Sequence, residues 1–235
     1  RLWSERFWNK LTLAHGCYWH RCAFCDTSLD YIARYDAADA RTVLRWMDAV
    51  HAQTGRTGFH FVDEAAPPAL LRQVATALAL RGAPYAWWTN IRLDRPFGAD
   101  LARALADGGC IAVSTGLECP SDRLLRLMRK GTSLREAARI LTVFAEAGIL
   151  THAYLMYGFP TQTVQETVDG LDFVRGLFLR KVLHSAYWHR FALTCHSPIA
   201  AEPERFRIRL LPHDARFACN EIPYCEPRAA DHARL

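Results

Sequence analysis

The sequence contains only three lysines among its 29 basic residues, and its excess of positive charge is small. Against 24 acidic residues the net charge is +5 over 235 residues, and the basic residues are dispersed. A nucleic-acid surface gathers basic side chains on one face, so we expect no nucleic-acid partner. Long apolar runs are also missing, because the richest window, Leu141–Pro160, contains Glu146 and His152. We therefore expect no membrane-spanning helix, which needs about 20 apolar residues.

Several sequence motifs are absent as well. The chain has no G-x-G-x-x-G or G-x4-G-K-[ST] loop, no H-E-x-x-H helix and no G-x-S-x-G elbow, which argues against hydride transfer, P-loop phosphoryl transfer, zincin and α/β-hydrolase chemistry. No signal-peptide pattern occurs, and the chain starts Arg1-Leu2-Trp3 without methionine. We expect a piece of a longer protein with flanking domains missing. Eight cysteines, three of them within nine residues, favour a reducing cytoplasmic compartment over a disulfide framework.

Apolar runs of strand length alternate with amphipathic segments, a pattern typical of βαβ units and a parallel sheet. The composition, 51% hydrophobic and 23% charged, is that of a globular α/β domain. We expect strands over 11–14, 59–62, 85–91, 110–117, 149–157 and 184–194. We expect helices over 38–54, 67–78, 100–106, 132–148 and 164–179, and a further helix capped by Ser121. The tail is expected to be mostly irregular, with one alternating segment over 205–210.

Parallel strands in a βα series place their carboxyl ends on one rim, where active sites of such folds lie. The candidate positions on that rim are the cysteine loop after the first strand, Asp63-Glu64 after the second, 89–92 after the third, Glu118 after the fourth, Gly158 after the fifth and Cys195-His196 after the sixth. Each of these residues also has an ordinary structural explanation, such as a solvated turn, a helix cap or a surface arginine.

Cys17, Cys22 and Cys25 form a C-x4-C-x2-C pattern in the first of these loops. Three thiolates on a [4Fe–4S] cluster leave one iron open for a substrate or cofactor, whereas a structural zinc ion needs a closed set of four ligands. His15 or His20 would complete a zinc site. The residues alone therefore leave three alternatives: an iron–sulfur cluster, a zinc-stabilised ligand-binding barrel without radical chemistry, or three merely buried free thiols.

The triplet and its context resemble the radical SAM superfamily, in which three closely spaced cysteines follow the first strand of a partial (β/α)6 TIM-like barrel. The family's usual spacing is C-x3-C-x2-C, so this chain has one residue more between the first two cysteines. The style of the loop is similar to cobalamin-binding-domain (B12-type) members. Further segments similar to the family's later motifs are Ser114–Glu118, Met128–Gly131 and Tyr157–Thr163.

The resemblance implies that Cys17, Cys22 and Cys25 hold a [4Fe–4S] cluster and that the core reductively cleaves S-adenosylmethionine (SAM) to a 5′-deoxyadenosyl radical. The reaction would be cobalamin-dependent methyl transfer or a related C–H functionalisation. The residues matching family positions for SAM are Phe24 and Gly158 near the adenine, Asp63 and Glu64 at the family's Gly-Gly-Glu position for the methionine amino group, Glu118 for the ribose or ammonium group, and Arg92 for a carboxylate.

The resemblance also implies partners and a domain organisation. We expect residues 1–200 to form the core barrel and 201–235 an extension continuing into a missing domain, with cobalamin bound through a missing N-terminal domain. The substrate would be a small molecule or peptide, and a flavodoxin or ferredoxin would supply electrons. A less favoured alternative is a degenerate barrel that has lost its cofactor. Cys110, Cys119 and Cys195 are expected to be packing residues, because lone cysteines behave as small buried hydrophobes. Two points stay open: an auxiliary cluster at Cys219 and Cys225, and whether Tyr18, Trp19, Tyr157 and Trp188 line a cavity or the core.

Overall fold

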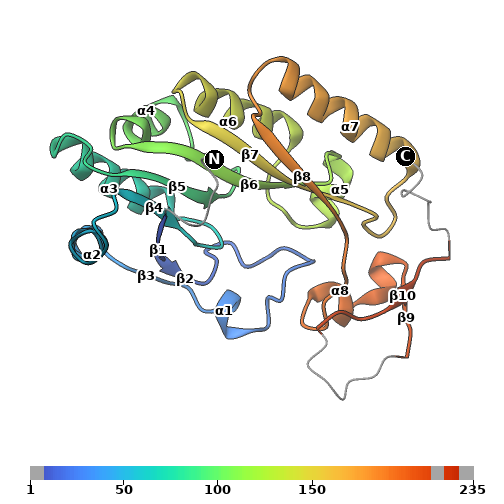
Figure 1. Ribbon diagram of the computed structural model, residues 1–235. Coiled ribbons are helices and arrows are strands. Elements are labelled where there is room, and N and C mark those ends of the chain that lie inside the picture. Colours follow the sequence, from blue (N-terminus) through green and yellow to red (C-terminus); the bar gives the residue numbers. More distant parts are fainter. Residues whose placement is uncertain (1–7, 213–219, 228–235) are drawn as a thin grey trace.

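A computed structural model describes residues 8–212 and 220–227 of the chain. Its centre is a six-stranded parallel sheet in the order β1-β4-β5-β6-β7-β8, shown in Figure 1. The two outer strands, β1 and β8, do not pair with each other among the described residues, so the sheet stays open. This confirms the expected α/β fold, a partial barrel with parallel strands. The strands are β1 (Asn9–Leu11), β4 (Gly58–Phe61), β5 (Ala86–Ile91), β6 (Cys110–Glu118), β7 (Leu150–Tyr157) and β8 (Ser185–Arg190).

Helices connect the strands and cover one face of the sheet (Figure 1). Their starts agree with local capping chemistry, because Asp39, Ser133 and Thr163 each accept a hydrogen bond from a backbone amide of the first turn. No described helix has both the length and the apolar character needed to cross a membrane. The helices are α2 (Ala40–Thr54), α3 (Pro68–Leu80), α4 (Ala99–Asp107), α5 (Asp122–Leu127), α6 (Leu134–Glu146) and α7 (Val164–Leu179).

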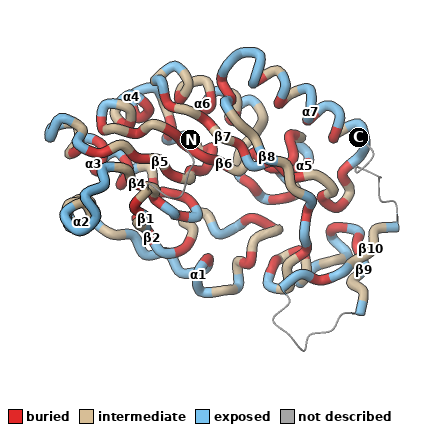
Figure 2. Tube along the Cα trace, viewed as in Figure 1, coloured by how far each residue is buried: buried red, intermediate tan, exposed pale blue. Residues whose placement is uncertain are grey.

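The main hydrophobic core lies between these helices and the sheet, visible as buried segments in Figure 2. Phe59, Phe61 and Trp87 are completely buried in it. The Trp87 indole N–H donates to the carbonyl oxygen of Gly108 at 2.7 Å, which satisfies its one polar atom. Side chains of the opposite strand face, such as His60 and Trp88, point to the inside of the open barrel, because residues alternate along a strand.

The first strand is shifted relative to the expected 11–14, and this expectation is corrected. β1 ends at Leu11, and the chain then forms β2 (Ala14–His15), which pairs antiparallel with β3 (Asp36–Ala37). The cause is the buried carboxylate of Asp63, which accepts hydrogen bonds from the backbone amides of Leu13 (3.0 and 3.1 Å) and Ala14 (2.8 Å). Because these amides bond to Asp63, they do not take part in the six-stranded sheet. The chain leaves the barrel at this point and continues as the cysteine loop. A short helix, α1 (Asp30–Ala33), follows the loop.

The tail after β8 has more regular structure than expected. It contains α8 (Pro198–Ala201), a 3-10 helix η2 (Pro203–Phe206), and the pair β9 (Arg209–Leu210) and β10 (Tyr224–Cys225). Its apolar side chains form a second core with the ends of β6 and β7 and the cysteine loop; among its members are Ala23, Met156, Phe159, Phe191, Ile199, Phe206 and Ile222. The domain boundary expected after residue 200 falls within α8, and residues on both sides of it pack into this second core. Cys219 lies outside the described residues.

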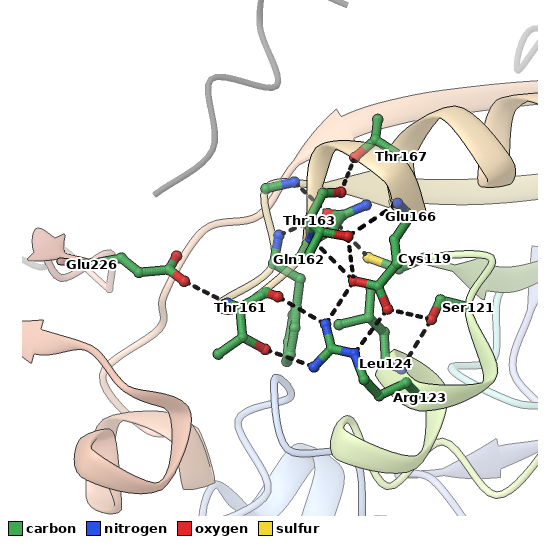
Figure 3. A network of polar contacts seen from close by, with 12 residues as sticks. Cys119, Ser121, Arg123, Leu124, Thr161, Gln162, Thr163, Glu166, Thr167 and Glu226 are labelled. Carbon is green, nitrogen blue, oxygen red and sulfur yellow. Dashed lines mark hydrogen bonds and ion pairs between the residues drawn. The ribbon is translucent and has the colours of Figure 1, made fainter. Parts of the chain in front are cut away.

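A polar network centred on Glu166 ties α5, α7 and the tail together (Figure 3). Glu166 completes a capping box with Thr163 and accepts from Arg123 Nη2 (2.6 Å) and Ser121 Oγ (2.8 Å). Arg123 also donates to the carbonyl oxygen of Thr161 at 2.8 Å, and the Thr161 amide donates to Glu226 beyond β10 at 2.7 Å. The network therefore fixes the turn between β7 and α7, at the carboxyl end of β7.

Glu166→Gln is expected to lower the free energy of unfolding at pH 7 by about 1 kcal/mol, because it weakens the bonds with Arg123. Burial by itself raises the pKa of Glu166, but the bonds from Arg123, Thr163 and Ser121 outweigh it and lower the pKa to about 2. Because the folded pKa lies below the unfolded one, the stabilisation is present above about pH 4.5 and is lost as the pH falls toward 2. Urea titrations at pH 7, 4 and 3 should show the difference from the unsubstituted chain shrinking. Glu146→Gln, at an exposed site on α6, should show no such trend.

Candidate active site

A cavity of about 450 Å³ lies at the carboxyl ends of the strands. It brings together side chains from the loop after β1 and from the ends of β4, β5 and β6. Eight of the nine site residues expected from the sequence line it: Cys17, Cys22, Phe24, Cys25, Asp63, Glu64, Arg92 and Glu118. Gly158 is not among the lining residues; it lies in the β7–α7 turn with φ +73°, and its amide donates to Gln162 Oε1 at 2.8 Å.

The cysteine loop is held in place by backbone hydrogen bonds to three distant segments. The amide of Ala23 donates to the carbonyl of Met128 (2.8 Å), and the carbonyl of Ala23 accepts from Ile199 on α8 (3.1 Å). The amide of Cys17 donates to the carbonyl of Ile32 on α1 at 3.3 Å. The loop is therefore fixed by α1, α5 and the tail, which positions the cysteines before any cofactor binds.

Trp19 locks the same loop onto the segment between α5 and α6. Its indole N–H donates to the carbonyl oxygen of Arg129 at 2.9 Å, and its ring lies against Gly131. A Cβ at Gly131 would come within 2.3 Å of the ring, and Gly131 has φ +79°, a conformation that glycine adopts most easily. The space above Gly131 is thus occupied by Trp19.

Gly131→Ala is expected to displace Trp19 and to reduce the iron content after anaerobic reconstitution, because the cysteine loop loses its anchor. Backbone strain alone costs about 1 kcal/mol. Gly148→Ala is the matched control: Gly148 has nearly the same φ, +77°, but no atom lies within 4 Å of its Cβ position. Iron and sulfide analysis of both variants shows how far cluster assembly depends on the contact between Trp19 and Gly131. Equal iron content in the two variants would contradict an anchoring role for Trp19.

Arg92 is buried, 5% exposed, and its guanidinium is surrounded by partners. It donates from Nε to Asp94 Oδ2 (3.1 Å) and from Nη2 to the carbonyl oxygen of Lys130. Its Nη1 lies 3.8 Å from Cys22 Sγ, and the group sits 4.5 Å from the centre of the Trp19 ring. The structure thus places Arg92 as a fixed positive charge beside the second cysteine.

Lys130 is a site residue that the sequence reasoning did not single out. Its ammonium group donates to Glu118 Oε1 at 2.6 Å, and both side chains are buried, with exposed fractions of 9% and 8%. It also lies 5.6 Å from the centre of the Phe24 ring. Lys130 falls within the segment Met128–Gly131 that resembles a family motif, but only the packing of this segment under the cysteine loop brings it into the cavity.

The end of β6 is shaped to hold this ion pair. The pairing of β6 with β7 shifts between Gly116 and Glu118, and Glu118 has φ +61°. A bulge of this kind redirects a side chain at the end of a strand. A Cβ at Gly116 would lie 2.0 Å from Glu118 Oε1 and 2.8 Å from Lys130 Nζ, so glycine leaves the room that the pair occupies.

The surroundings of Cys22 favour its thiolate, whereas the hydrogen bond to Cys22 and burial raise the pKa of Cys25. A hydrogen bond from Cys25 and the nearby charges of Lys130 and Arg92 lower the pKa of Cys22, against the effect of burial. Among the described residues no three His, Cys, Asp or Glu side chains are placed to hold a single metal ion. In a [4Fe–4S] cluster each cysteine binds a different iron, so the thiolates need not converge on one point. The donor set and its positive surroundings fit such a cluster, and the zinc alternative is not supported.

The two acids after β4 have different surroundings. Asp63 is 1% exposed and engaged by the Leu13 and Ala14 amides; burial raises its pKa to about 6, although those amides lower it. Glu64 is exposed and lines the cavity. Both residues line the cavity, but the Asp63 carboxylate is engaged in ordering the start of the cysteine loop, whereas Glu64 is the exposed one of the two.

The four aromatic residues considered for a substrate cavity are all placed elsewhere. Tyr18 donates to Asp94 Oδ2 at 2.6 Å, Trp19 anchors the loop, and Trp188 packs against the main core. Neither Tyr157 nor any of these three is among the residues lining the cavity. Tyr154, on the other face of β7, does line it. Cys110 and Cys119 are buried, as expected for packing residues, and Cys195 is half-buried.

Comparison with known proteins identifies relatives by sequence and by structure. An uncharacterised methyltransferase of Pyrococcus horikoshii is 24% identical over 166 residues, 70% of this chain and 36% of the relative. TsrM of Kitasatospora setae, a radical S-adenosylmethionine methyltransferase solved with cobalamin and a [4Fe–4S] cluster, has a TM-score of 0.73 at 19% identity, covering 88% of this chain and 43% of that one. OxsB, a cobalamin-dependent S-adenosylmethionine radical enzyme, has a TM-score of 0.73 at 14% identity, covering 92% and 38%. The chain thus spans less than half the length of each.

The family model of the radical SAM superfamily matches residues 11–174, which are 164 of the 235 residues. The match includes the cysteine triplet, Glu64, Arg92 and the Glu118–Lys130 pair. It confirms the resemblance found in the sequence, the enzyme class, and a [4Fe–4S] cluster and SAM as the cofactors of the family. By the extent of this match, together with the open barrel and its cysteine-lined cavity, the chain belongs to the radical SAM superfamily.

Proposed function

We propose that this chain is the catalytic core of a radical SAM enzyme that cleaves SAM reductively and acts in cobalamin-dependent methyl transfer or a related C–H functionalisation. The observation that carries the proposal is the cavity at the strand ends, in which three cysteines of one loop lie beside two buried cations, Arg92 and Lys130. The arrangement suits an anionic cluster with one open position.

In this proposal Cys17, Cys22 and Cys25 hold the [4Fe–4S] cluster. When bound and reduced, the cluster supplies the electron that breaks a carbon–sulfur bond of SAM. The chain keeps the thiolates in place through the Ala23 and Trp19 contacts, and Arg92 and Lys130 offset their negative charge. The closely packed second core behind Ala23 shields this part of the site from water.

We assign the SAM contacts to the expected residues that face the cavity. Phe24 packs against the adenine, and Glu64 accepts from the methionine amino group. Glu118, already held by Lys130, accepts from the ribose hydroxyls. Arg92 and Asp63 act as positioning residues, because protein groups already occupy their polar atoms. Gly158 contributes by shaping the β7–α7 turn near the adenine.

Cobalamin is proposed as a further cofactor, bound by a domain that precedes the barrel. The support is that the solved structures of TsrM and OxsB contain cobalamin and share this fold. Methyl transfer is further supported by the Pyrococcus horikoshii relative, which is described as a methyltransferase. We also propose that, within a longer protein, residues 1–200 form the core domain and residues 201–235 form an extension that continues into a further domain.

The proposed setting is the cytoplasm, with a small-molecule or peptide substrate and a flavodoxin or ferredoxin as electron donor. All seven cysteines of the described residues are free thiols, which suits a reducing compartment. An auxiliary cluster at Cys219 and Cys225 is not part of the proposal, because two cysteines alone do not supply the ligands of a cluster. Cys225 is half-buried in β10, and Cys219 is outside the described residues.

The test is anaerobic reconstitution with iron and sulfide, followed by reduction with dithionite, addition of SAM and chromatography for 5′-deoxyadenosine. We expect roughly four irons per chain and formation of 5′-deoxyadenosine. Methyl transfer is tested on a longer protein that includes the proposed cobalamin domain, with hydroxocobalamin added and S-adenosylhomocysteine measured. Tightly bound zinc with neither iron nor SAM cleavage would overturn the proposal.

A further inference from the structure

A second cavity, of about 750 Å³, lies beside the cysteine loop and shares no lining residue with the cysteine-lined cavity. It is bounded by the cysteine loop, by the turn after β5 and by the segment that runs from α5 into α6. Five arginines line it, and all five are exposed. We call them the arginine patch: Arg21, Arg95, Arg126, Arg129 and Arg135.

The positive charge of the arginine patch is not balanced within the described chain. None of the five side chains forms an ion pair or a hydrogen bond with a described residue. Glu136 is the one carboxylate among the lining residues, and Arg139 already binds it at 2.7 Å. That bond, together with the charges of Arg95 and Arg135, holds the pKa of Glu136 below its usual range. The cavity therefore has five positive charges against one negative charge that is already paired.

The fold, and not the sequence, brings these charges together. The five arginines are spread over residues 21–135 and come from three separate segments. Like charges that gather around one hollow repel each other and produce a strong local field. An anionic partner relieves the repulsion and is attracted by the field from a distance. The patch therefore fits a partner with an acidic surface.

The wall of this second cavity leads directly to the cysteines. Trp19 lines the cavity, and the centre of its ring lies 4.5 Å from the Arg92 guanidinium. The Nη1 atom of Arg92 is in turn 3.8 Å from Cys22 Sγ. The guanidinium of Arg21, a member of the patch, lies 5.4 Å from the centre of the same Trp19 ring. Two side chains, Trp19 and Arg92, thus connect the arginine patch to Cys22.

An acidic protein fits this surface better than a nucleic acid does. Proteins that bind single-stranded nucleic acid stack bases on exposed aromatic rings. Trp19 is the aromatic residue among those lining the cavity, and its ring is packed against Gly131. A nucleic-acid substrate would also have to reach the cysteine-lined cavity, which has no lining residue in common with the patch.

We infer that the arginine patch is the docking surface for the acidic face of a small electron-transfer protein that reduces the cluster from the Trp19 side of the cysteine loop. This inference rests on the proposed function, because it locates the electron donor of the same site. One electron leaves the redox centre of the donor, which is oxidised, and enters the cluster, which is reduced. No group is transferred. Interfaces between electron-transfer partners are small and depend on complementary charge, as this patch would.

The experiment compares two variants that change the net charge equally. Both combine three arginine-to-glutamate substitutions at exposed positions. The patch variant leaves out Arg21 and Arg129, which lie next to Trp19 or bond to it through the backbone. The patch variant is Arg95→Glu, Arg126→Glu and Arg135→Glu. The control variant, on α2, on α3 and at the end of α7 and outside the cavity, is Arg41→Glu, Arg72→Glu and Arg180→Glu.

The probe is an oxidised flavodoxin, an acidic electron-transfer protein, titrated calorimetrically against the anaerobically reconstituted chain. At about 50 mM KCl we expect the patch variant to bind it at least about tenfold more weakly than the control variant. The difference should shrink at about 500 mM KCl, because salt screens exposed charges. Formation of 5′-deoxyadenosine with reduced flavodoxin should fall by a similar factor. Reduced methyl viologen, which needs no docking surface, should drive both variants equally.

The methyl viologen assay tests the proposed function, and the two flavodoxin assays test the inference. A chain that cleaves SAM with methyl viologen, but whose patch variant binds flavodoxin and accepts its electrons like the control variant, overturns the inference alone. Absence of cleavage with methyl viologen overturns the proposed function, and the titration then still decides whether the patch binds flavodoxin. Equal iron content in the two variants shows that both fold. Replacing the same three patch arginines with glutamine should give a smaller loss in the same direction and serves if the glutamate variant does not fold.

A second titration tests the other class of anionic partner. A single-stranded oligouridylate of about 20 nucleotides is titrated against the same chains at about 150 mM KCl. We expect it to bind more weakly than flavodoxin. Tighter binding of the oligouridylate than of flavodoxin, lost in the patch variant and kept in the control variant, would assign the patch to nucleic acid and overturn the inference.

Discussion

Cys22→Ala is expected to lower the iron content after reconstitution from roughly four per chain to near zero and to abolish 5′-deoxyadenosine formation. Cys22 is 5% exposed, and its sulfur lies 3.8 Å from Arg92 Nη1. Without its thiolate, two cysteines remain to hold the cluster. The measurements are iron and sulfide analysis, the absorption spectrum of the reconstituted chain, and chromatography after addition of dithionite and SAM.

Cys110→Ala is the matched control for this loss. Cys110 is a buried cysteine at the start of β6, and its thiol contacts the carbonyl oxygen of Ala112 at 3.6 Å. It does not line the cysteine-lined cavity, so its replacement should leave the iron content unchanged. The circular dichroism of both variants should match that of the unsubstituted chain. SAM cleavage retained by a folded Cys22→Ala chain would rule out the assignment of the cluster to this triplet.

Lys130→Met is expected to lower the free energy of unfolding by about 3–5 kcal/mol, because it leaves the carboxylate of Glu118 buried without its partner. The Lys130–Glu118 distance is 2.6 Å and both side chains are more than 90% buried. Urea unfolding of the anaerobic chain without cluster measures this effect. Lys181→Met, at an exposed lysine after α7, should change the stability by less than about 0.5 kcal/mol.

A double variant distinguishes the stranded charge from a loss of packing. Lys130→Met combined with Glu118→Met should recover most of the lost stability, because replacing both partners of a buried pair removes the uncompensated charge. We expect the midpoint potential of the reconstituted cluster to be more negative in Lys130→Met than in Lys181→Met, because a positive charge beside Cys22 is lost. The double variant should lie between them, because it also removes the opposing negative charge of Glu118. An unchanged potential would show that Lys130 does not influence the cluster.

Much of the fold follows from local patterns in the sequence. The helix expected over 164–179 is α7 with the same bounds, and the expected cap at Asp39 accepts from the Thr42 amide. The alternation of strands and helices predicts a parallel sheet, because period and capping depend on neighbouring residues. The cysteine triplet is equally local: three thiols within nine residues are brought together by one loop, whatever surrounds it.

Other features depend on contacts between residues that are distant in the sequence. Asp63 ends the first strand early because its carboxylate receives amides 49 and 50 residues away. Tyr154, and not Tyr157, lines the cysteine-lined cavity, because strand register decides which aromatic residues face the inside of the barrel. A strand that is buried on both faces is apolar on both, so its sequence does not show which side chains face the inside of the barrel.

The sequence by itself determined the class of this protein: an α/β chain with three convergent cysteines and the motifs of the radical SAM superfamily. The electrostatic environment of those cysteines was decided by tertiary structure. Arg92 and Lys130 reach Cys22 only because the cysteine loop docks on the segment after α5, through Trp19 above Gly131 and Ala23 against Met128. A buried charge needs partners on all sides, and these come from separate elements. Their meeting is a property of the packed molecule, because no spacing along the chain encodes it.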